Sequence, residues 1–182
     1  AVVSYQTAWL KAHHTAAFMA ATISSDMDDT DSVKIFVDDA QKNGIAILPP
    51  DVNQSVYRFV PVDRKNVRYG LGAIKGTGEG AIVNLVESRR QDGAFTDLFD
   101  FCRRIDRRIV NRRVIEALVR AGAFDSLHAN RNATLMSVGL AMEWAETRLA
   151  HAAQDSLFGD TALEDAPPLV NAALWSLREQ LA

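Results

Sequence analysis

The stretch LGAIKGTGEGAIVNLV, residues 71–86, places three glycines within five residues, Gly76 to Gly80, between two segments with helical spacing of apolar residues. Leu71 and Ile74 mark the first segment, and the second begins at Ala81. Glycine accepts backbone conformations that other residues avoid, so such a turn can bring its N–H groups close to a ligand. The stretch predicts a short helical segment, a loose glycine hairpin and a second helix.

This order resembles the helix-hairpin-helix motif, in which the turn approaches a DNA backbone. N–H groups at a glycine turn and at the start of the following helix form a concave set of donors, and the helix dipole favours an anion there. Contacts of this kind go to phosphate and cannot read base sequence. Thr77 stands where the motif commonly has an aliphatic residue. The predicted DNA contacts in this turn are Lys75, Gly76, Thr77, Gly78 and Gly80.

The glycines allow two other interpretations. A dinucleotide fingerprint is excluded, because neither Gly70 nor Gly76 begins a G-x-G-x-x-G and no strand-helix-strand unit surrounds them. A plain surface loop remains an alternative.

A second helix, glycine turn and helix follow further along the chain. Asn111 is a good N-cap for a helix whose apolar face is Val114, Ile115, Leu118 and Val119, and AGAF at 121–124 closes it. Asn130 then begins a longer helix with the apolar stripe Leu135, Val138, Met142, Ala145 and Leu149. Two such units can hold both strands of a duplex. The second unit has the single glycine Gly122 and is therefore a degenerate copy of the first. A structural role for this turn is the alternative to DNA contact.

Between the two units, CRRIDRRIVNRR at 102–113 carries three arginine pairs. If this segment is helical, members of successive pairs lie toward one side. Residues 64–120 carry 13 Lys and Arg against 7 Asp and Glu, in a chain whose net charge is −3, which favours a polyanion-binding face. The alternative is a set of surface salt bridges to Asp100 and Asp106. The candidate arginines are Arg103, Arg104, Arg107, Arg108, Arg112 and Arg113.

The remaining segments predict a mainly α fold with a small β-hairpin. Residues 5–24 form one helix or two short ones broken near His14, and a helix from Ser32 to Asn43 stops at Gly44. An extended segment ends at the prolines of ILPP. Residues 56–62 and 67–71 then pair as the only sheet expected.

Composition excludes several classes of protein. No apolar run reaches the roughly 18 residues of a membrane span, and no signal peptide precedes the first helix, so a cytoplasmic protein is expected. Cys102 is the single cysteine and predicts a buried structural thiol. The acidic run Asp26–Asp31 lacks the glycine and distal glutamate of a calcium loop and reads as helix-capping carboxylates. No metal site and no catalytic residue are predicted. The chain looks like a piece of something longer.

Several blocks resemble the bacterial replicative DNA polymerase III alpha subunit over residues 4–159: SYQTAWLKAHH, ILPPDVN, RYGLGAIKGTGEGA, LFDFCRRID and NRRVIEALVRAGAFDSL. The resemblance implies that residues 1–50 end the fingers domain. Residues 51–150 would form a tandem helix-hairpin-helix region that holds duplex DNA behind the active site. The family's catalytic carboxylates, with their Mg²⁺, belong to an upstream palm domain without a counterpart here. The fragment alone is therefore not expected to polymerise DNA, and it needs no cofactor of its own.

The same resemblance gives meaning to residues 151–168, a predicted linker before a further element at 169–182. Its QDSLF resembles the pentapeptide that binds the ring-shaped sliding clamp, with Leu157 and Phe158 as paired apolar anchors and Gln154 hydrogen-bonding at the rim. The alternative is that Leu157 and Phe158 pack on their own domain. Two other functions remain as alternatives: a repair nuclease with a paired hairpin, for which Asp26–Asp31 is the only candidate site, and a structural adaptor without DNA affinity. The clamp-binding residues are Gln154, Asp155, Ser156, Leu157 and Phe158.

Overall fold

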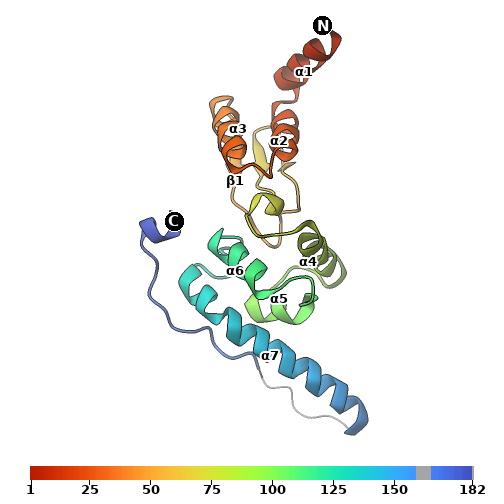
Figure 1. Cartoon of the computed structure of the whole chain (residues 1–182), viewed down its shortest axis with the longest axis vertical. Coiled ribbons are helices and arrows are strands. Elements are labelled where there is room, and N and C mark those ends of the chain that lie inside the picture. Colours follow the sequence, from red (N-terminus) through yellow and green to blue (C-terminus); the bar gives the residue numbers. More distant parts are fainter. Residues whose placement is uncertain (159–164, 182) are drawn as a thin grey trace. The chain divides into compact units, whose positions relative to one another are not determined.

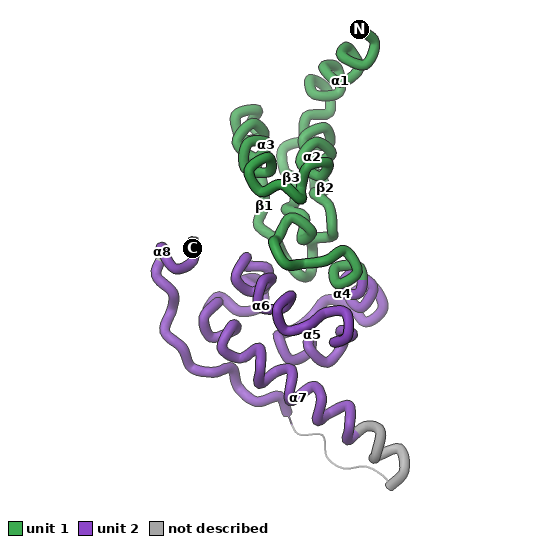
Figure 2. The backbone as a smooth tube through the Cα atoms, in the orientation of Figure 1, with its two compact units in different colours: residues 1–83 green, residues 84–182 purple. Residues whose placement is uncertain are grey.

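A computed structural model describes residues 1–158 and 165–181, without the side chains of 152–158, 177 and 181. The chain forms two compact units, residues 1–83 and 84–182 (Figure 2). Helices dominate both units, and one small sheet lies in the first (Figure 1). The mainly α fold with a β-hairpin is confirmed. Within the described residues, no helix is long and apolar enough to cross a membrane.

The first unit begins with three helices, α1 (Val2–His13), α2 (Thr15–Ser25) and α3 (Thr30–Lys42). The chain breaks between α1 and α2 at His14, whose φ of −132° and ψ of 49° lie outside the helical region. Of the two expectations for this segment, the pair of short helices is the correct one. No residue of α1 is buried, whereas α2 buries Ala16, Met19, Ala20, Ile23 and Ser24.

Both ends of α3 carry the predicted signals. The side chain of Asp29 accepts hydrogen bonds from the Asp31 N–H at 3.1 Å and the Ser32 hydroxyl at 2.9 Å. Gly44, with φ of 77°, ends the helix in a Schellman motif, in which the Ile45 N–H reaches back to the Ala40 carbonyl at 3.0 Å. The acidic run therefore caps a helix, and the described residues contain no cluster of acidic, His or Cys side chains that could hold a metal.

A three-stranded sheet follows, formed by β1 (Ala46–Leu48), β2 (Val60–Pro61) and β3 (Asn66–Arg68). The antiparallel pairing of β2 with β3 confirms the predicted hairpin. The predicted two-stranded sheet is incomplete, because the extended segment before the prolines forms β1, which pairs in parallel with β3 and makes β3 the central strand. Prolines 49 and 50 follow β1 directly. They do not prevent the pairing, because the three residues of β1 form an edge strand that ends before the first proline.

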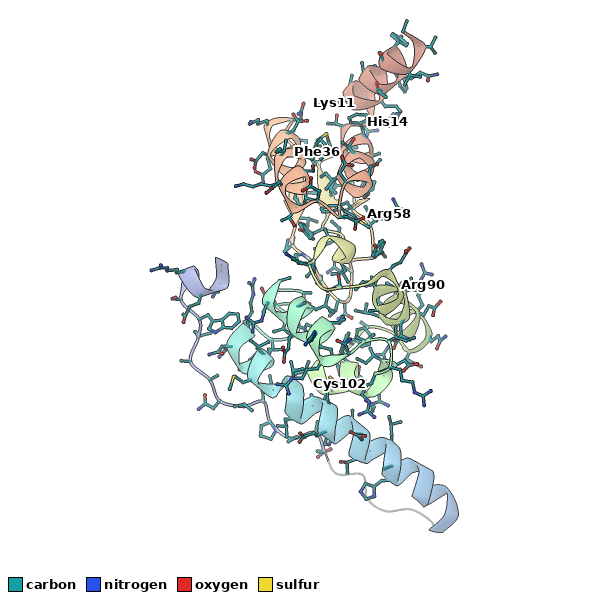
Figure 3. The ribbon with its side chains drawn as sticks, in the orientation of Figure 1. Lys11, His14, Phe36, Arg58, Arg90 and Cys102 are labelled. Atoms are coloured by element: carbon teal, nitrogen blue, oxygen red, sulfur yellow. The ribbon has the colours of Figure 1, made fainter. Side chains whose placement is uncertain are left out.

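α2 and α3 pack against this sheet to form the core of the first unit, where Phe36 of α3 packs on the buried cluster (Figure 3). That cluster joins Met19 and Ile23 of α2 to Phe59 and Val67 of the sheet region. The Phe59 N–H also donates to the buried Ser24 hydroxyl at 3.0 Å. The proposed domain boundary at residue 50 thus falls inside one compact unit, and it stays a prediction.

The second unit contains most of α4 (Glu79–Asp92), then α5 (Leu98–Arg104), α6 (Arg112–Arg120), α7 (Arg131–Phe158) and α8 (Leu177–Leu181). Phe101 is fully buried and meets Phe95 and Phe124 edge-on, with ring centroids 4.8 and 5.0 Å away. Cys102 beside it is the buried thiol that the sequence predicts, and burial raises its pKa to about 12. The thiol is therefore unreactive at neutral pH.

The buried stripe of α7 is made of smaller residues than predicted. Val138 and Ala145 are buried as expected, but Leu149 is about half exposed. Small side chains let α5 and α6 approach α7 closely. The other fully or nearly buried positions are Ala133, Thr134, Ser137 and Ala141.

Residues 165–176, which precede α8, form no helix or strand and return alongside α7 (Figure 1). The Val170 N–H donates to the Ser137 hydroxyl at 2.7 Å, and the amides of Asn130 and Asn132 donate to the Ala172 and Ala173 carbonyls at 2.8 Å. This docking was not predicted from the sequence. The polar residue Ser137 on the buried stripe of α7 could have indicated that another segment forms a hydrogen bond there.

Candidate nucleic-acid interface

The hairpin at Lys75–Gly80 is a tight turn that requires its first glycine. Ile74 accepts a hydrogen bond from the Thr77 N–H at 3.2 Å, which closes a four-residue turn. Gly76 is the third residue of this turn and has φ of 94°, the conformation that type II turns require at that position. The preceding helical element is one short 3₁₀ turn, η1 (Leu71–Ala73).

Two glycines outside the hairpin fix η1 against the rest of the first unit. The N–H groups of Leu71 and Gly72 donate to the carbonyls of Val56 and Tyr57 at 2.8 and 2.9 Å. A Cβ on Gly70 would lie 2.6 Å from the backbone of Arg58. Gly70 therefore allows close approach to the backbone of Arg58, and Gly72 allows close approach to the Tyr57 ring, and neither role was predicted from the sequence.

The start of α4 contains exposed residues whose backbone donors have no acceptor among the described residues. The Gly78 carbonyl accepts the N–H groups of Ala81 and Ile82 at 3.1 and 3.3 Å. The N–H groups of Gly78, Glu79 and Gly80 precede these bonds, and none has an acceptor in the part of the chain that the structure describes. A Cβ on Gly78 would meet nothing within 4 Å. These donors and the positive end of the α4 dipole suit an anion such as a phosphate.

Charged side chains flank this turn on both sides. Lys75 is exposed and makes no ion pair with any described residue. Glu79 is also exposed, at the first position of α4, and its carboxylate opposes an approaching phosphate. The geometry brings the five predicted turn residues together at one surface, except that the Thr77 hydroxyl points inward to the Leu71 carbonyl at 2.7 Å.

The second turn, between α6 and α7, is closed. Gly122, with φ of 83°, ends α6 in a Schellman motif, and its N–H already donates to the Val119 carbonyl at 3.0 Å. A Cβ on Gly122 would collide with the Arg131 guanidinium, which forms a forked ion pair with Asp125 at 2.7 to 3.0 Å. The pair raises the pKa of Arg131. Gly122 thus has a structural role here, and no free donor marks it as a phosphate contact.

The arginine segment is not one helix. α5 ends at Arg104 and α6 begins at Arg112, and the chain between them turns, with the Asp106 N–H bonded to the Asn84 side chain at 3.0 Å. The helical spacing that would gather the six arginines on one side is therefore absent.

Two of these arginines make internal contacts. The Arg104 side chain is 6% exposed and donates to the Asp100 carboxylate and to the carbonyls of Ser88 and Gly93 at 3.0, 2.9 and 2.7 Å. Arg107 donates to the Met142 carbonyl of α7 at 3.2 Å. Arg104 thus pairs with Asp100, as the intramolecular alternative predicts, whereas Arg107 contacts Met142 and Glu146 and neither Asp100 nor Asp106. These internal contacts make both residues weaker candidates for DNA contact, which stays a prediction.

The other four arginines are more exposed. Arg103 pairs with Asp100 at 2.8 Å, and Arg112 pairs with Glu116 at 2.7 Å. Arg108 and Arg113 are exposed, and the described residues offer their side chains no partner. These last two are the strongest candidates for phosphate contacts in this segment.

The side chains of the QDSLF segment, Gln154 to Phe158, lie outside the described residues. Clamp binding by this segment therefore stays a prediction.

Comparison with known proteins agrees with the geometry of the turn. The chain is 51% identical over its whole length to the DNA polymerase III subunit alpha of Neisseria meningitidis serogroup B. It is 48% and 46% identical, over 92% and 90% of its length, to those of Vibrio cholerae serotype O1 and Escherichia coli strain K12. It spans only 14 to 16% of the length of these relatives. Residues 44–134, half of the chain, match the family described as helix-hairpin-helix motif, and the chain therefore belongs to that family.

Proposed function

We propose that this chain is the duplex-binding part of a bacterial replicative polymerase alpha subunit, and that it binds the DNA backbone without reading sequence. The open turn at Lys75–Gly80 carries this proposal, because its three unbonded N–H groups and the α4 dipole suit phosphate oxygens. The relatives named above support the assignment to DNA replication.

Of the two glycine turns, only the one at Lys75–Gly80 is proposed to contact DNA. Backbone donors at Gly78 to Gly80 reach phosphate and sugar, which carry no base information. The second turn is covered by Arg131 and Asp125, so it supports the fold instead. Arg108 and Arg113 add charge that increases affinity without specificity.

Binding of the 182-residue chain to two fluorescently labelled duplexes of unrelated sequence, over a salt series, tests this function. Both duplexes are expected to bind equally, with log K falling linearly with log salt, by about 0.9 per neutralised phosphate. Lys75→Ala should weaken binding. Glu79→Gln should strengthen it, because it removes the opposing charge beside the same donors. A chain that binds neither duplex at low salt, or prefers one strongly, would contradict the proposal.

The activity of the whole polymerase is assigned to parts of the protein outside this chain. We place the catalytic carboxylates and their Mg²⁺ in the upstream palm, and the protein in the cytoplasm. The support is the resemblance to the alpha subunits, whose remaining length is several times that of this chain. The isolated chain is expected to show no nucleotide incorporation on a primed template.

Tethering to the sliding clamp through Gln154–Phe158 is the second part of the proposed function. A five-residue peptide binds weakly, but linked to a DNA-binding unit it raises the local concentration of the polymerase on the template. Replacing both Leu157 and Phe158 by Ala should abolish binding to purified clamp and leave duplex affinity unchanged. Unaltered clamp binding in this double variant would refute the role of the segment.

A further inference from the structure

The Thr77 hydroxyl is the feature of the hairpin that its proposed contacts do not use. Its oxygen lies 2.7 Å from the Leu71 carbonyl oxygen and 2.8 Å from the Ile74 carbonyl oxygen. A hydroxyl has one proton, so the two carbonyls share it. The Thr77 N–H also donates to Ile74. Residue 77 is thus joined through both side chain and backbone to the helical turn before it.

The two neighbours of Thr77 make this connection important. Gly76 and Gly78 lack side chains, and glycine has more accessible backbone conformations than any other residue. Gly78 has no neighbour within 4 Å of a Cβ position, so packing does not restrain it. The side chain between these glycines is therefore the one that can order the turn.

We infer that Thr77 is a positioning residue: its hydroxyl fastens the hairpin to η1 and so pre-arranges the Gly78–Gly80 donors for phosphate, without touching DNA itself. This inference rests on the proposed function. In this chain, the hydrogen bonds of the Thr77 hydroxyl connect the hairpin to the residues of the preceding turn. A turn that is ordered before binding loses less conformational freedom on binding.

Thr77→Val tests the inference, because valine has nearly the same shape and lacks the hydroxyl. It should weaken duplex binding about two- to tenfold, which corresponds to one hydrogen bond. It should also speed amide hydrogen exchange at Ile74 and Thr77 in the chain without DNA. Thr77→Ser restores the hydroxyl and should bring both values to within about twofold of the wild-type chain. Thr147→Val is the matched control, since the Thr147 hydroxyl donates to the Glu143 carbonyl on an exposed part of α7.

Each outcome has a distinct meaning. Weaker binding and faster exchange in Thr77→Val, both rescued by serine, support the inference. Weaker binding with unchanged exchange in the free chain would mean that the hydroxyl acts on DNA directly, and this overturns the positioning role. Unchanged binding in Thr77→Val also overturns it, while the proposed function stands. If the wild-type chain binds no duplex, the proposed function fails, and the inference fails with it.

Discussion

The guanidinium of Arg104 and the carboxylate of Asp100 lie 3.0 Å apart, with 6% and 14% of their side chains exposed. Arg104 lies over the Phe95 ring at 4.4 Å and joins the end of α4 to α5 through three backbone carbonyls. A residue that looks like a DNA contact in the sequence is a brace of the second unit. The sequence suggested Asp100 as a partner, but it did not show the three carbonyl acceptors, which lie 10 to 16 residues before Arg104.

Replacing Arg104 by Ala should lower the free energy of unfolding by about 3 kcal/mol, because it leaves Asp100 half-paired and several carbonyls unbonded. Arg103→Ala is the matched control. It removes a more exposed partner of the same carboxylate and should cost less than about 1 kcal/mol. Urea unfolding of both variants measures the difference, and equal costs would show that Arg104 is not a brace.

The acid stability of the second unit should depend on Asp100. Burial raises the pKa of Asp100, but hydrogen bonds from Arg103, the Thr96 N–H and Arg104 outweigh this effect, and the pKa lies below its ordinary value. The stabilisation is therefore complete above the unfolded pKa of about 4 and is lost as pH falls through the folded pKa.

Asp100→Asn isolates this effect, because the other low-pKa carboxylates remain in both proteins. The stability difference between the wild-type chain and Asp100→Asn should be largest above about pH 5 and should shrink toward pH 2. Urea unfolding across this range measures it. A difference that does not vary with pH would assign the role of Asp100 to shape instead of charge.

Gly122 and Gly93 provide a matched test of the closed second turn. Both have positive φ, 83° and 82°, but a Cβ on Gly93 meets nothing within 4 Å, whereas one on Gly122 meets the Arg131 guanidinium. Gly93→Ala should cost about 1 kcal/mol from backbone strain, and Gly122→Ala about 2 to 3 kcal/mol because the Arg131 ion pair must also move. Thermal unfolding of the two variants compares them, and equal costs would mean that Arg131 moves away freely.

Arg108 and Arg113 should contribute to duplex affinity through charge alone. Alanine at either position should weaken binding to any sequence and reduce the salt slope by up to about 0.9. Arg103→Ala should leave the slope nearly unchanged, since that guanidinium is already paired. Salt-dependent fluorescence anisotropy measures all three. A slope unaffected by Arg108→Ala and Arg113→Ala would exclude these residues from the interface.

Interactions between residues close in sequence allowed several helix ends and one turn to be predicted before the structure was known. Asp29 and Gly44 at the ends of α3, Asn111 at the start of α6 and the glycine turn at 76–80 are signals between residues close in sequence. Caps and tight turns are bonded within a few residues, so their pattern appears in the sequence itself. The family resemblance extended this reading to the function.

Contacts between distant residues were decided by the tertiary structure alone. The sequence did not show that β1 pairs with β3, that residues 165–176 return along α7, or that Arg107 reaches Met142. The six arginines of residues 103–113 look alike in the sequence. Only the tertiary packing determines which of them contact carbonyls and carboxylates and which are exposed to solvent. The two glycine turns also look alike in the sequence. In the structure, the Arg131–Asp125 ion pair covers the second turn at Gly122, whereas no atom lies within 4 Å of a Cβ position on Gly78 in the first. The identity of a charged or glycine residue follows from the sequence, but its availability to a ligand depends on what the fold places beside it.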